Sequence, residues 1–218
     1  MRTFKCLCLD LDGTLVDTER LHVKAELHAL RCLGISELSD EHPRTFGNGI
    51  ERGADEMCKH YGINDASRYL AEYLPIWHRS LEVELELMPG ARNLLEMTYQ
   101  RHIPVALVTS ENTQYTESVT RRLAIDGFFA CTIRGDSVSH MKPHPEPYLQ
   151  AAQNLGIAAK DCVGIEDSGA GVNSLISAGM YAIAVHVDAH RRPELSVAAE
   201  RFTSLIEITD TVVERLFP

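Results

Sequence analysis

The sequence has no apolar run long enough to cross a lipid bilayer. A membrane-spanning helix needs about 20 consecutive apolar residues, whereas the apolar run near the start, residues 4–9 (FKCLCL), stops at Asp10. Acidic residues follow this run at once, without the longer apolar region and small-residue cleavage site of a secretory signal peptide. We therefore expect a cytoplasmic protein with no membrane partner.

Paired cysteine motifs are missing as well. Their absence argues against a zinc site or a disulfide framework and favours small buried side chains in a reducing compartment. The ten histidines also show no spacing that predicts a metal site. The six cysteines are scattered along the chain: Cys6, Cys8, Cys32, Cys58, Cys131 and Cys162.

Positive charge is scarce. The formal net charge is -10 at pH 7, so the chain lacks the basic surface with which proteins neutralise nucleic-acid phosphates. We therefore expect no nucleic-acid partner. An acidic protein that binds a phosphorylated molecule must compensate charge locally, so such a function would require a cation in the site.

The hydrophobic pattern that is present changes twice along the chain. Residues 4–9 are typical of a buried central strand. From about residue 18 to residue 86, apolar residues recur at helical spacing, punctuated by Gly34, Pro43, Gly62 and Pro75. Strands and helices then alternate. We expect strands at 103–108, 130–133, 162–165 and 181–185, and helices at 91–100, 112–123, 145–155 and 169–178.

Strands separated by one helix each indicate right-handed crossovers and a parallel sheet. The first strand must join this sheet, because an apolar run of that kind needs burial, so the helical block is an insertion. We predict an α/β fold with a Rossmann-like core from residues 1–14 and 88–218 and an inserted α-helical domain at residues 15–87.

Two carboxylates follow the first strand, in the segment DLDGT at residues 10–14. Open parallel sheets bind ligands outside the carboxyl ends of their strands. In extended chain, Asp10 and Asp12 point to the same side, roughly 7 Å apart, and repel each other unless a cation or a proton intervenes. This arrangement suits one ionised nucleophile and one proton donor. The alternative is a pair of loop aspartates, one of which caps a helix.

Three further polar segments follow apolar strands. Thr109 and Ser110 end VALVTS and can hold phosphoryl oxygens through a hydroxyl and a backbone N–H. Lys142, in MKPHPEPY, can offset negative charge, and Glu166 and Asp167, in VGIEDSGAG, are hard oxygen ligands that suit Mg²⁺. The alternatives are helix capping for the hydroxyl and acidic residues and a solvated surface position for the lysine.

The four segments, in this order, resemble the motifs of the haloacid dehalogenase superfamily, in its phosphatase and phosphomutase branch. The resemblance covers essentially the whole chain, and the inserted block matches the family's α-helical cap in position and size. It implies that Asp10 is the nucleophile, that it forms an aspartyl-phosphate, and that Asp12 is the general acid and base. It also implies a Mg²⁺ cofactor held by Asp10, the Asp12 carbonyl and Asp167, with Glu166 binding directly or through water.

The residues of the inserted helical block say less about the substrate than the four core segments say about the reaction. The segment 46–52 (FGNGIER) occupies the part that often carries substrate specificity in the family, where Arg52 can clamp a second anionic group; the alternative is an exposed helix arginine. His22 can face the active site or pack within the cap. We expect a magnesium-dependent phosphatase of a small phosphorylated metabolite, such as a sugar phosphate. The alternative is a β-phosphoglucomutase-like mutase, although the third cap helix contains no lysine.

Overall fold

The structure, a computed structural model, describes residues 3–36 and 50–218. It divides into two compact units. The core unit comprises Met1–Val16 and Leu87–Pro218, and the insert unit comprises Asp17–Glu86. Within the described residues, no helix combines the length and the apolar character needed to span a membrane.

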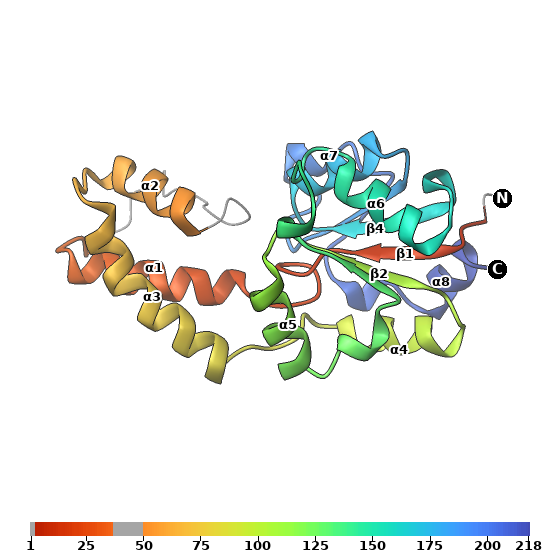
Figure 1. Cartoon of the computed structure of the whole chain (residues 1–218), viewed down its shortest axis with the longest axis horizontal. Coiled ribbons are helices and arrows are strands. Elements are labelled where there is room, and N and C mark those ends of the chain that lie inside the picture. The colour runs from red at the N-terminus through yellow and green to blue at the C-terminus, as the bar shows by residue number, and fades with distance from the viewer. Residues whose placement is uncertain (1–2, 37–49) are drawn as a thin grey trace. The chain divides into compact units, whose positions relative to one another are not determined.

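A parallel sheet forms the centre of the core unit (Figure 1). Its strand order is β3-β2-β1-β4-β5-β6, and every neighbouring pair is parallel. The order runs one way from β1 to β3 and the other way from β4 to β6, so the direction reverses between β1 and β4. The strands are β1 (Cys6–Leu9), β2 (Val105–Val108), β3 (Cys131–Ile133), β4 (Cys162–Glu166), β5 (Tyr181–Val185) and β6 (Glu200–Phe202).

Helices cover both faces of this sheet, as right-handed crossovers require. Figure 1 shows α6 and α7 on one face and α4, α5 and α8 on the other. The helices are α4 (Ala91–Gln100), α5 (Thr113–Arg122), α6 (Glu146–Leu155), α7 (Gly169–Ser177) and α8 (Asp210–Leu216). Short 3-10 helices lie at Asp126–Phe128, Gly135–Ser137, Ala159–Asp161, Pro193–Leu195 and Leu205–Glu207.

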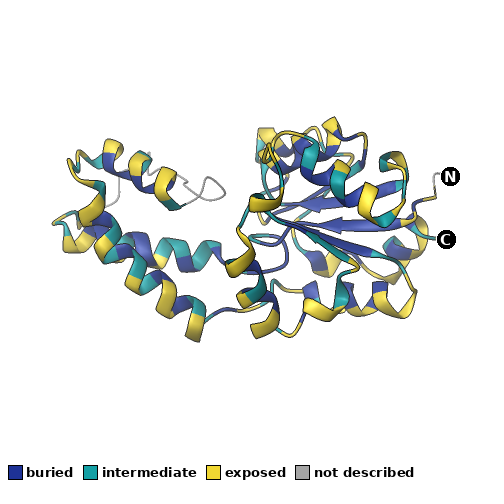
Figure 2. Ribbon diagram, in the orientation of Figure 1, coloured by how far each residue is buried: buried dark blue, intermediate teal, exposed yellow. Residues whose placement is uncertain are grey.

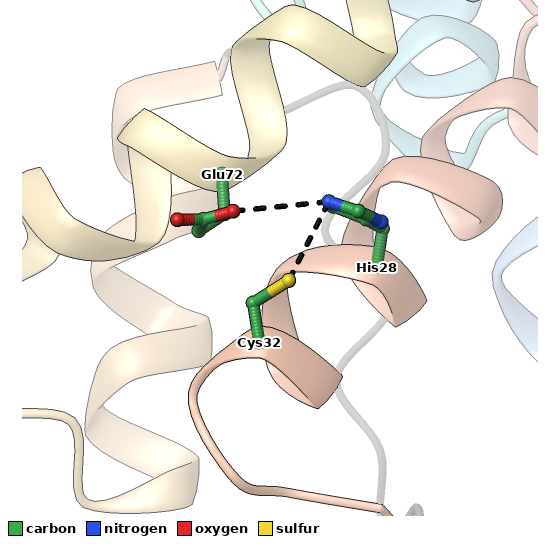
Figure 3. Close-up of side chains that lie close together, drawn as sticks. All are labelled: His28, Cys32 and Glu72. Atoms are coloured by element: carbon green, nitrogen blue, oxygen red, sulfur yellow. Dashed lines mark hydrogen bonds and ion pairs between the residues drawn. The ribbon is translucent and has the colours of Figure 1, made fainter.

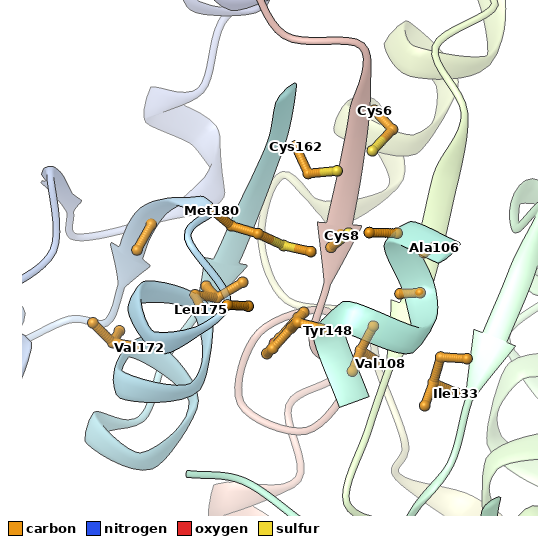
Figure 4. Close-up of a cluster of buried hydrophobic side chains, with 14 of the residues drawn as sticks. Cys6, Cys8, Ala106, Val108, Ile133, Tyr148, Cys162, Val172, Leu175 and Met180 are labelled. Carbon is orange, nitrogen blue, oxygen red and sulfur yellow. The ribbon is translucent and has the colours of Figure 1, made fainter. Parts of the chain in front are cut away.

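The central strands are buried on both faces, which explains their near-continuous apolar sequences. Figure 2 shows these central strands in the buried colour and the helices with one buried and one exposed side. Beneath α6 and α7, cysteines and small residues of the strands pack against Tyr148 and Leu175 (Figure 4). Cys6, Cys8 and Cys162 belong to this cluster as fully buried free thiols, as predicted. The prediction of buried cysteines was wrong for Cys32, which is exposed, and holds only in part for Cys131, which is half-buried.

The insert unit is helical in its described part, with α1 (Glu19–Cys32), α2 (Ile50–Tyr61) and α3 (Ala66–Val83). Helices α1 and α3 pack along each other. On α3, buried Tyr69, Tyr73 and Trp77 recur every four residues and form one face. Asp65 caps this helix by accepting a hydrogen bond from the Ser67 N–H at 2.9 Å.

The predicted α/β fold with a parallel sheet is confirmed. The expected bounds agree fully for α4 and β5 and within three residues for the other predicted elements of the core. The prediction that Pro75 interrupts the helical pattern was wrong. This residue lies inside α3, where apolar packing outweighs the cost of a proline. We did not predict β6 or α8: β6 has three half-buried residues, two of them charged, and α8 only seven. Pro43 lies outside the described residues.

Candidate active site

The predicted core residues lie at the carboxyl ends of three neighbouring strands. Asp10 follows β1, Thr109 follows β2, and Glu166 and Asp167 end and follow β4. The backbone N–H of Asp10 donates to the carbonyl of Ile165 at 3.2 Å, which fixes β1 against β4 at this edge. The reversal of strand order between β1 and β4 leaves a crevice position where open α/β sheets bind ligands.

Lys142 connects these strand ends from the loop before α6. Its Nζ lies 2.6 Å from Asp10 Oδ1 and 2.6 Å from Glu166 Oε1, and it donates to the carbonyl of Val108 at 2.8 Å. The side chains of Lys142, Asp10 and Glu166 are only 6%, 10% and 1% exposed. Burial by itself lowers the pKa of Lys142, but the two carboxylates outweigh it and raise that pKa above its ordinary value. The ammonium therefore stays charged.

Glu166 is held by a second set of contacts. The Tyr148 hydroxyl donates to Glu166 Oε1 at 2.6 Å, and the Ser168 hydroxyl donates to Oε2 at 3.2 Å. A Cβ at Gly171 would lie 1.9–2.0 Å from the carboxylate atoms of Glu166, so this position has no room for a side chain. The Glu166 carboxylate consequently has a fixed position at the end of β4.

Asp10, Glu166 and Asp167 together form a dense group of acids. One carboxylate oxygen from each lies within 4.8 Å of the other two. Burial, then the charge of Glu166, raises the pKa of Asp10 to about 7, although Lys142 opposes this shift. Burial, then the charge of Asp10, raises the pKa of Asp167 well above its usual range. One ammonium does not balance three carboxylates, so the group has the electrostatics of a site for a cation.

Asp12 lies beyond this group and has its own partner. The Tyr115 hydroxyl, on α5, donates to Asp12 Oδ1 at 2.6 Å. Burial and the charge of Asp12 raise the pKa of the nearby Glu111 to about 7.

Gly13, which follows Asp12, has φ +79°, and a Cβ there would lie 2.2 Å from Asp167 Oδ2. Glycine is therefore required for both the backbone conformation and the close approach.

The hydroxyl residues after β2 occupy the neighbouring strand end. Thr109 is buried, its N–H donates to the carbonyl of Ile133 at 3.0 Å, and its Oγ1 accepts from the Glu111 N–H at 3.1 Å. Ser110 is half-buried. A Cβ at Gly135 would lie 2.1 Å from the Ser110 carbonyl oxygen, so the two loops are in close contact. The Thr109 turn is thus fixed from both sides.

Sequence reasoning missed three residues of this site. Tyr148 and Tyr115 hold Glu166 and Asp12, and Glu111 adds a half-buried acid beside Asp12. Tyr148 follows the Lys-Pro segment closely, and its position on the inner face of α6 was a usable signal. The sequence contained no comparable signal for Tyr115, because this residue is separated by 103 positions from Asp12, which it contacts.

The two predicted cap residues lie in the insert unit. His22 is packed between aromatic residues: its ring stacks on Trp77 with centroids 3.8 Å apart, and its Nδ1 is hydrogen-bonded to the Tyr73 hydroxyl. Burial lowers the pKa of His22 to about 4. Arg52 is on α2, where its side chain is 73% exposed and its Nε lies 3.3 Å from Glu56 Oε1. Residues 46–49 of the expected specificity segment lie outside the described residues.

The fold and this edge of the sheet define an α/β protein with a group of acidic residues at the carboxyl ends of its central strands. Hexitol phosphatase A of Escherichia coli (strain K12) is 34% identical over 213 residues, which cover 95% of this chain and 94% of that protein. β-Phosphoglucomutase of Bacillus subtilis (strain 168) is 29% identical over 190 residues, 83% of each. A HAD family hydrolase from Deinococcus radiodurans R1, crystallised with phosphate and sodium, superposes with a TM-score of 0.84 at 22% identity. This last likeness, over 98% of this chain and 97% of that one, shows the fold alone.

Residues 7–185 match the haloacid dehalogenase-like hydrolase family. The chain belongs to this family and is an enzyme of the hydrolase class. The resemblance drawn from the four sequence segments is therefore confirmed. The roles of individual residues stay predictions.

Proposed function

We propose that the chain is a Mg²⁺-dependent phosphatase that hydrolyses a small phosphorylated metabolite, in the first place a sugar phosphate, through an aspartyl-phosphate on Asp10. The observation that carries this proposal is the buried Asp10–Lys142–Glu166 group with Asp167 beside it. Relatives named hexitol phosphatase and phosphorylated carbohydrates phosphatase support the sugar-phosphate class. The inserted α-helical domain, proposed at residues 15–87, would act as the cap that excludes bulk water during transfer.

In the first half-reaction, a carboxylate oxygen of Asp10 attacks the phosphorus atom, and the bond from phosphorus to the sugar oxygen breaks. Asp12 donates its proton to that leaving oxygen. In the second half-reaction, Asp12 takes a proton from a water molecule, whose oxygen attacks the phosphorus of the aspartyl-phosphate and releases inorganic phosphate. Asp10 and protonated Asp12 are then restored, so the cycle is balanced.

The transferring phosphoryl oxygens need donors that are already in place. We assign this role to the Thr109 hydroxyl, the Ser110 N–H and Lys142. Lys142 contacts Asp10 directly at 2.6 Å, so its charge lies where the phosphoryl group must arrive. Its contact with the Val108 carbonyl holds it there independently of the substrate.

The donor set fits a Mg²⁺ ion. Three carboxylates share one region, two of them with raised pKa values, and Lys142 supplies a positive charge in contact with Asp10 and Glu166. Asp10, the Asp12 carbonyl and Asp167 would hold the ion, with Glu166 directly or through water. When bound, the ion would neutralise charge on the phosphoryl group.

A phosphatase screen over a panel of phosphorylated metabolites, with Mg²⁺ and with a chelator, tests the proposal. We expect phosphate release with Mg²⁺ only, and none from the Asp10→Asn variant. Phosphate release by this variant at the parent's rate would refute the nucleophile assignment. No release from any sugar phosphate would refute the substrate class.

A mutase is the second candidate, because β-phosphoglucomutase of Bacillus subtilis matches over most of this chain. Such an enzyme would return the phosphoryl group from Asp10 to a sugar hydroxyl. Incubation with β-glucose 1-phosphate separates the two reactions. Free phosphate and glucose indicate the phosphatase, which we expect, and glucose 6-phosphate indicates the mutase.

A further inference from the structure

A second group of metal-ligating side chains lies in the insert unit, apart from the proposed reaction (Figure 3). His28 and Cys32 are four residues apart on α1, so they lie on one face of the helix. Glu72 reaches the same place from α3, the helix that packs along α1. One ligand atom from each residue lies within 4.8 Å of the other two.

We propose that His28, Cys32 and Glu72 bind one transition-metal cation, with Zn²⁺ as the preferred ion, and that the bound ion connects α1 to α3. A thiolate, an imidazole and a carboxylate form the mixed sulfur, nitrogen and oxygen donor set that zinc accepts. Three protein ligands leave one tetrahedral position for water or for a small anion. Zn²⁺ binding here runs against the expectation from the cysteine and histidine spacing, which argued against a zinc site, because spacing along the chain does not show a third ligand from a distant helix.

The observed separations are close to those that a tetrahedral ion requires. Zn–S and Zn–N bonds of about 2.3 and 2.0–2.1 Å at tetrahedral angles place sulfur and nitrogen about 3.5 Å apart. Cys32 Sγ and His28 Nε2 are 3.5 Å apart. Nitrogen and carboxylate oxygen would be about 3.4 Å apart, and His28 Nε2 and Glu72 Oε2 are at 3.8 Å. On binding an ion, the Glu72 carboxylate would have to move closer to His28 Nε2 by about 0.4 Å.

The charges and exposure of the group also suit a cation from solvent. The side chains of His28 and Glu72 are 44% and 43% exposed, so an ion can enter. A bound cation would stabilise the Cys32 thiolate, so the thiol proton leaves on binding.

A second cluster, in the core unit, offers a useful contrast. His140, His144 and Glu146 also lie within reach of one another. However, the Glu146 carboxylate already accepts the backbone N–H groups of Ser139 and His140, at 2.7 and 3.1 Å, and His144 Nδ1 accepts the Glu146 N–H at 3.2 Å. A metal there would have to replace hydrogen bonds that hold the start of α6. We therefore assign the metal to the His28 cluster alone.

Cobalt(II) titration of the full chain tests the proposal with a spectroscopic signature. A thiolate bound to Co²⁺ gives a near-ultraviolet charge-transfer band that carboxylate ligands cannot produce. Excess Mg²⁺ would occupy the acidic group of the core unit, and a thiol-free reductant would keep the cysteines reduced. We expect one Co²⁺ per chain with this band, and its displacement by one equivalent of Zn²⁺.

Variants locate the ligands. Cys32→Ser should abolish the band. His28→Gln and Glu72→Gln should each weaken Zn²⁺ binding by more than about tenfold, because even the loss of a residue that only hydrogen-bonds to a metal ligand usually weakens binding by that factor. Cys131→Ser, at a half-buried cysteine, and His140→Gln, in the contrasting cluster, should leave band and affinity unchanged. Absence of the band in the parent, or its persistence in Cys32→Ser, would overturn the proposal. Circular dichroism checks that each variant is folded.

Discussion

The charged groups around Asp10 in the core unit and the exposed charged groups of α1, α2 and α3 in the insert unit differ most in their contact with water. The side chains of Asp10, Lys142 and Glu166 are 10% exposed or less, and Lys142 contacts both carboxylates directly. In the insert unit, Arg52 is 73% exposed, and His28 and Glu72 are about half exposed. Buried charges are stable only in each other's presence, whereas exposed charges are screened by solvent. Substitutions of the buried and of the exposed charged groups should therefore differ greatly in effect.

The largest expected effect is the loss of catalysis in Asp10→Asn. The amide has nearly the same shape but cannot act as nucleophile, so kcat should fall by at least ~10³-fold. Initial rates of phosphate release from the best substrate of the panel measure this change. Asp126→Asn is the matched control, since Asp126 is an exposed carboxylate of the same unit, and it should retain the parent's rate.

Lys142→Met should affect both activity and folding. The variant removes the ammonium that contacts Asp10 and Glu166, and the unpaired carboxylates should cost about 3 kcal/mol of unfolding free energy without Mg²⁺. Loss of a preorganised charge should also lower kcat by ~10²-fold or more. Urea unfolding and initial rates measure the two effects.

The control for this variant is Lys5→Met. Lys5 is 65% exposed in its ion pair with Asp161, so its removal should cost less than about 1 kcal/mol. Equal losses of stability in the two lysine variants would contradict the comparison between buried and exposed charge.

Removal of Mg²⁺ should expose the repulsion among the acids. Burial and Glu166 raise the pKa of Asp10 to about 7, so between about pH 4 and pH 7 the folded chain binds more protons than the unfolded chain. Stability with a chelator should therefore fall as pH rises through this window, by on the order of a few kcal/mol. Urea unfolding at several pH values, with chelator and with Mg²⁺, measures the slopes. A slope that Mg²⁺ leaves unchanged would argue against an ion bound to these carboxylates.

His22 should give the opposite pH dependence in the insert unit. Burial lowers its pKa to about 4, so the folded chain binds fewer protons than the unfolded chain between about pH 4 and pH 6.5. Its contribution is complete above this window and is lost as pH falls through it, by on the order of 3 kcal/mol. His22→Phe keeps an aromatic ring against Trp77 and should flatten this part of the pH profile.

The control for this prediction lies on α3. His78 is exposed, and an exposed side chain meets water in the folded and unfolded states alike. His78→Phe should therefore keep the parent's pH dependence. If both variants flattened the profile equally, the burial of His22 would not be the cause.

Local sequence patterns accounted for most of the fold. Residues 181–185 and 91–100 were placed correctly because a continuous apolar run and a helical period are each visible within one segment. Strand β6 was missed because its three residues, Glu200–Phe202, show neither pattern. Its pairing with β5 comes from tertiary contact, which a local pattern does not contain.

The meeting of Asp10, Glu166 and Asp167 followed from their places at strand ends, since parallel strands bring these ends to one edge. Lys142 instead reaches them from the loop before α6, which strand order alone does not predict. The partners of these residues could not be inferred in the same way. The contact of Tyr115 with Asp12 depends on which face of α5 meets the sheet, and Glu72 meets Cys32 only because α1 and α3 pack together. Helix-to-helix and helix-to-sheet register was the missing information.

Substitution of Arg52 should have the smallest effect on stability, because its side chain is the most exposed of the charged groups compared above. Its contact with Glu56 is an i,i+4 pair on the surface of α2, worth about 0.3–0.5 kcal/mol. Arg52→Ala should therefore change the unfolding free energy by no more than about 0.5 kcal/mol, and Glu56→Ala, which removes the other partner, should match it.

If Arg52 acts only at the surface, the KM values of Arg52→Ala for a sugar monophosphate and for a sugar bisphosphate should stay within about twofold of the parent, because neither substrate loses an ionic contact with the enzyme. A rise in KM for the bisphosphate alone would instead show that Arg52 binds a second anionic group of the substrate. Glu56→Ala should not show this rise.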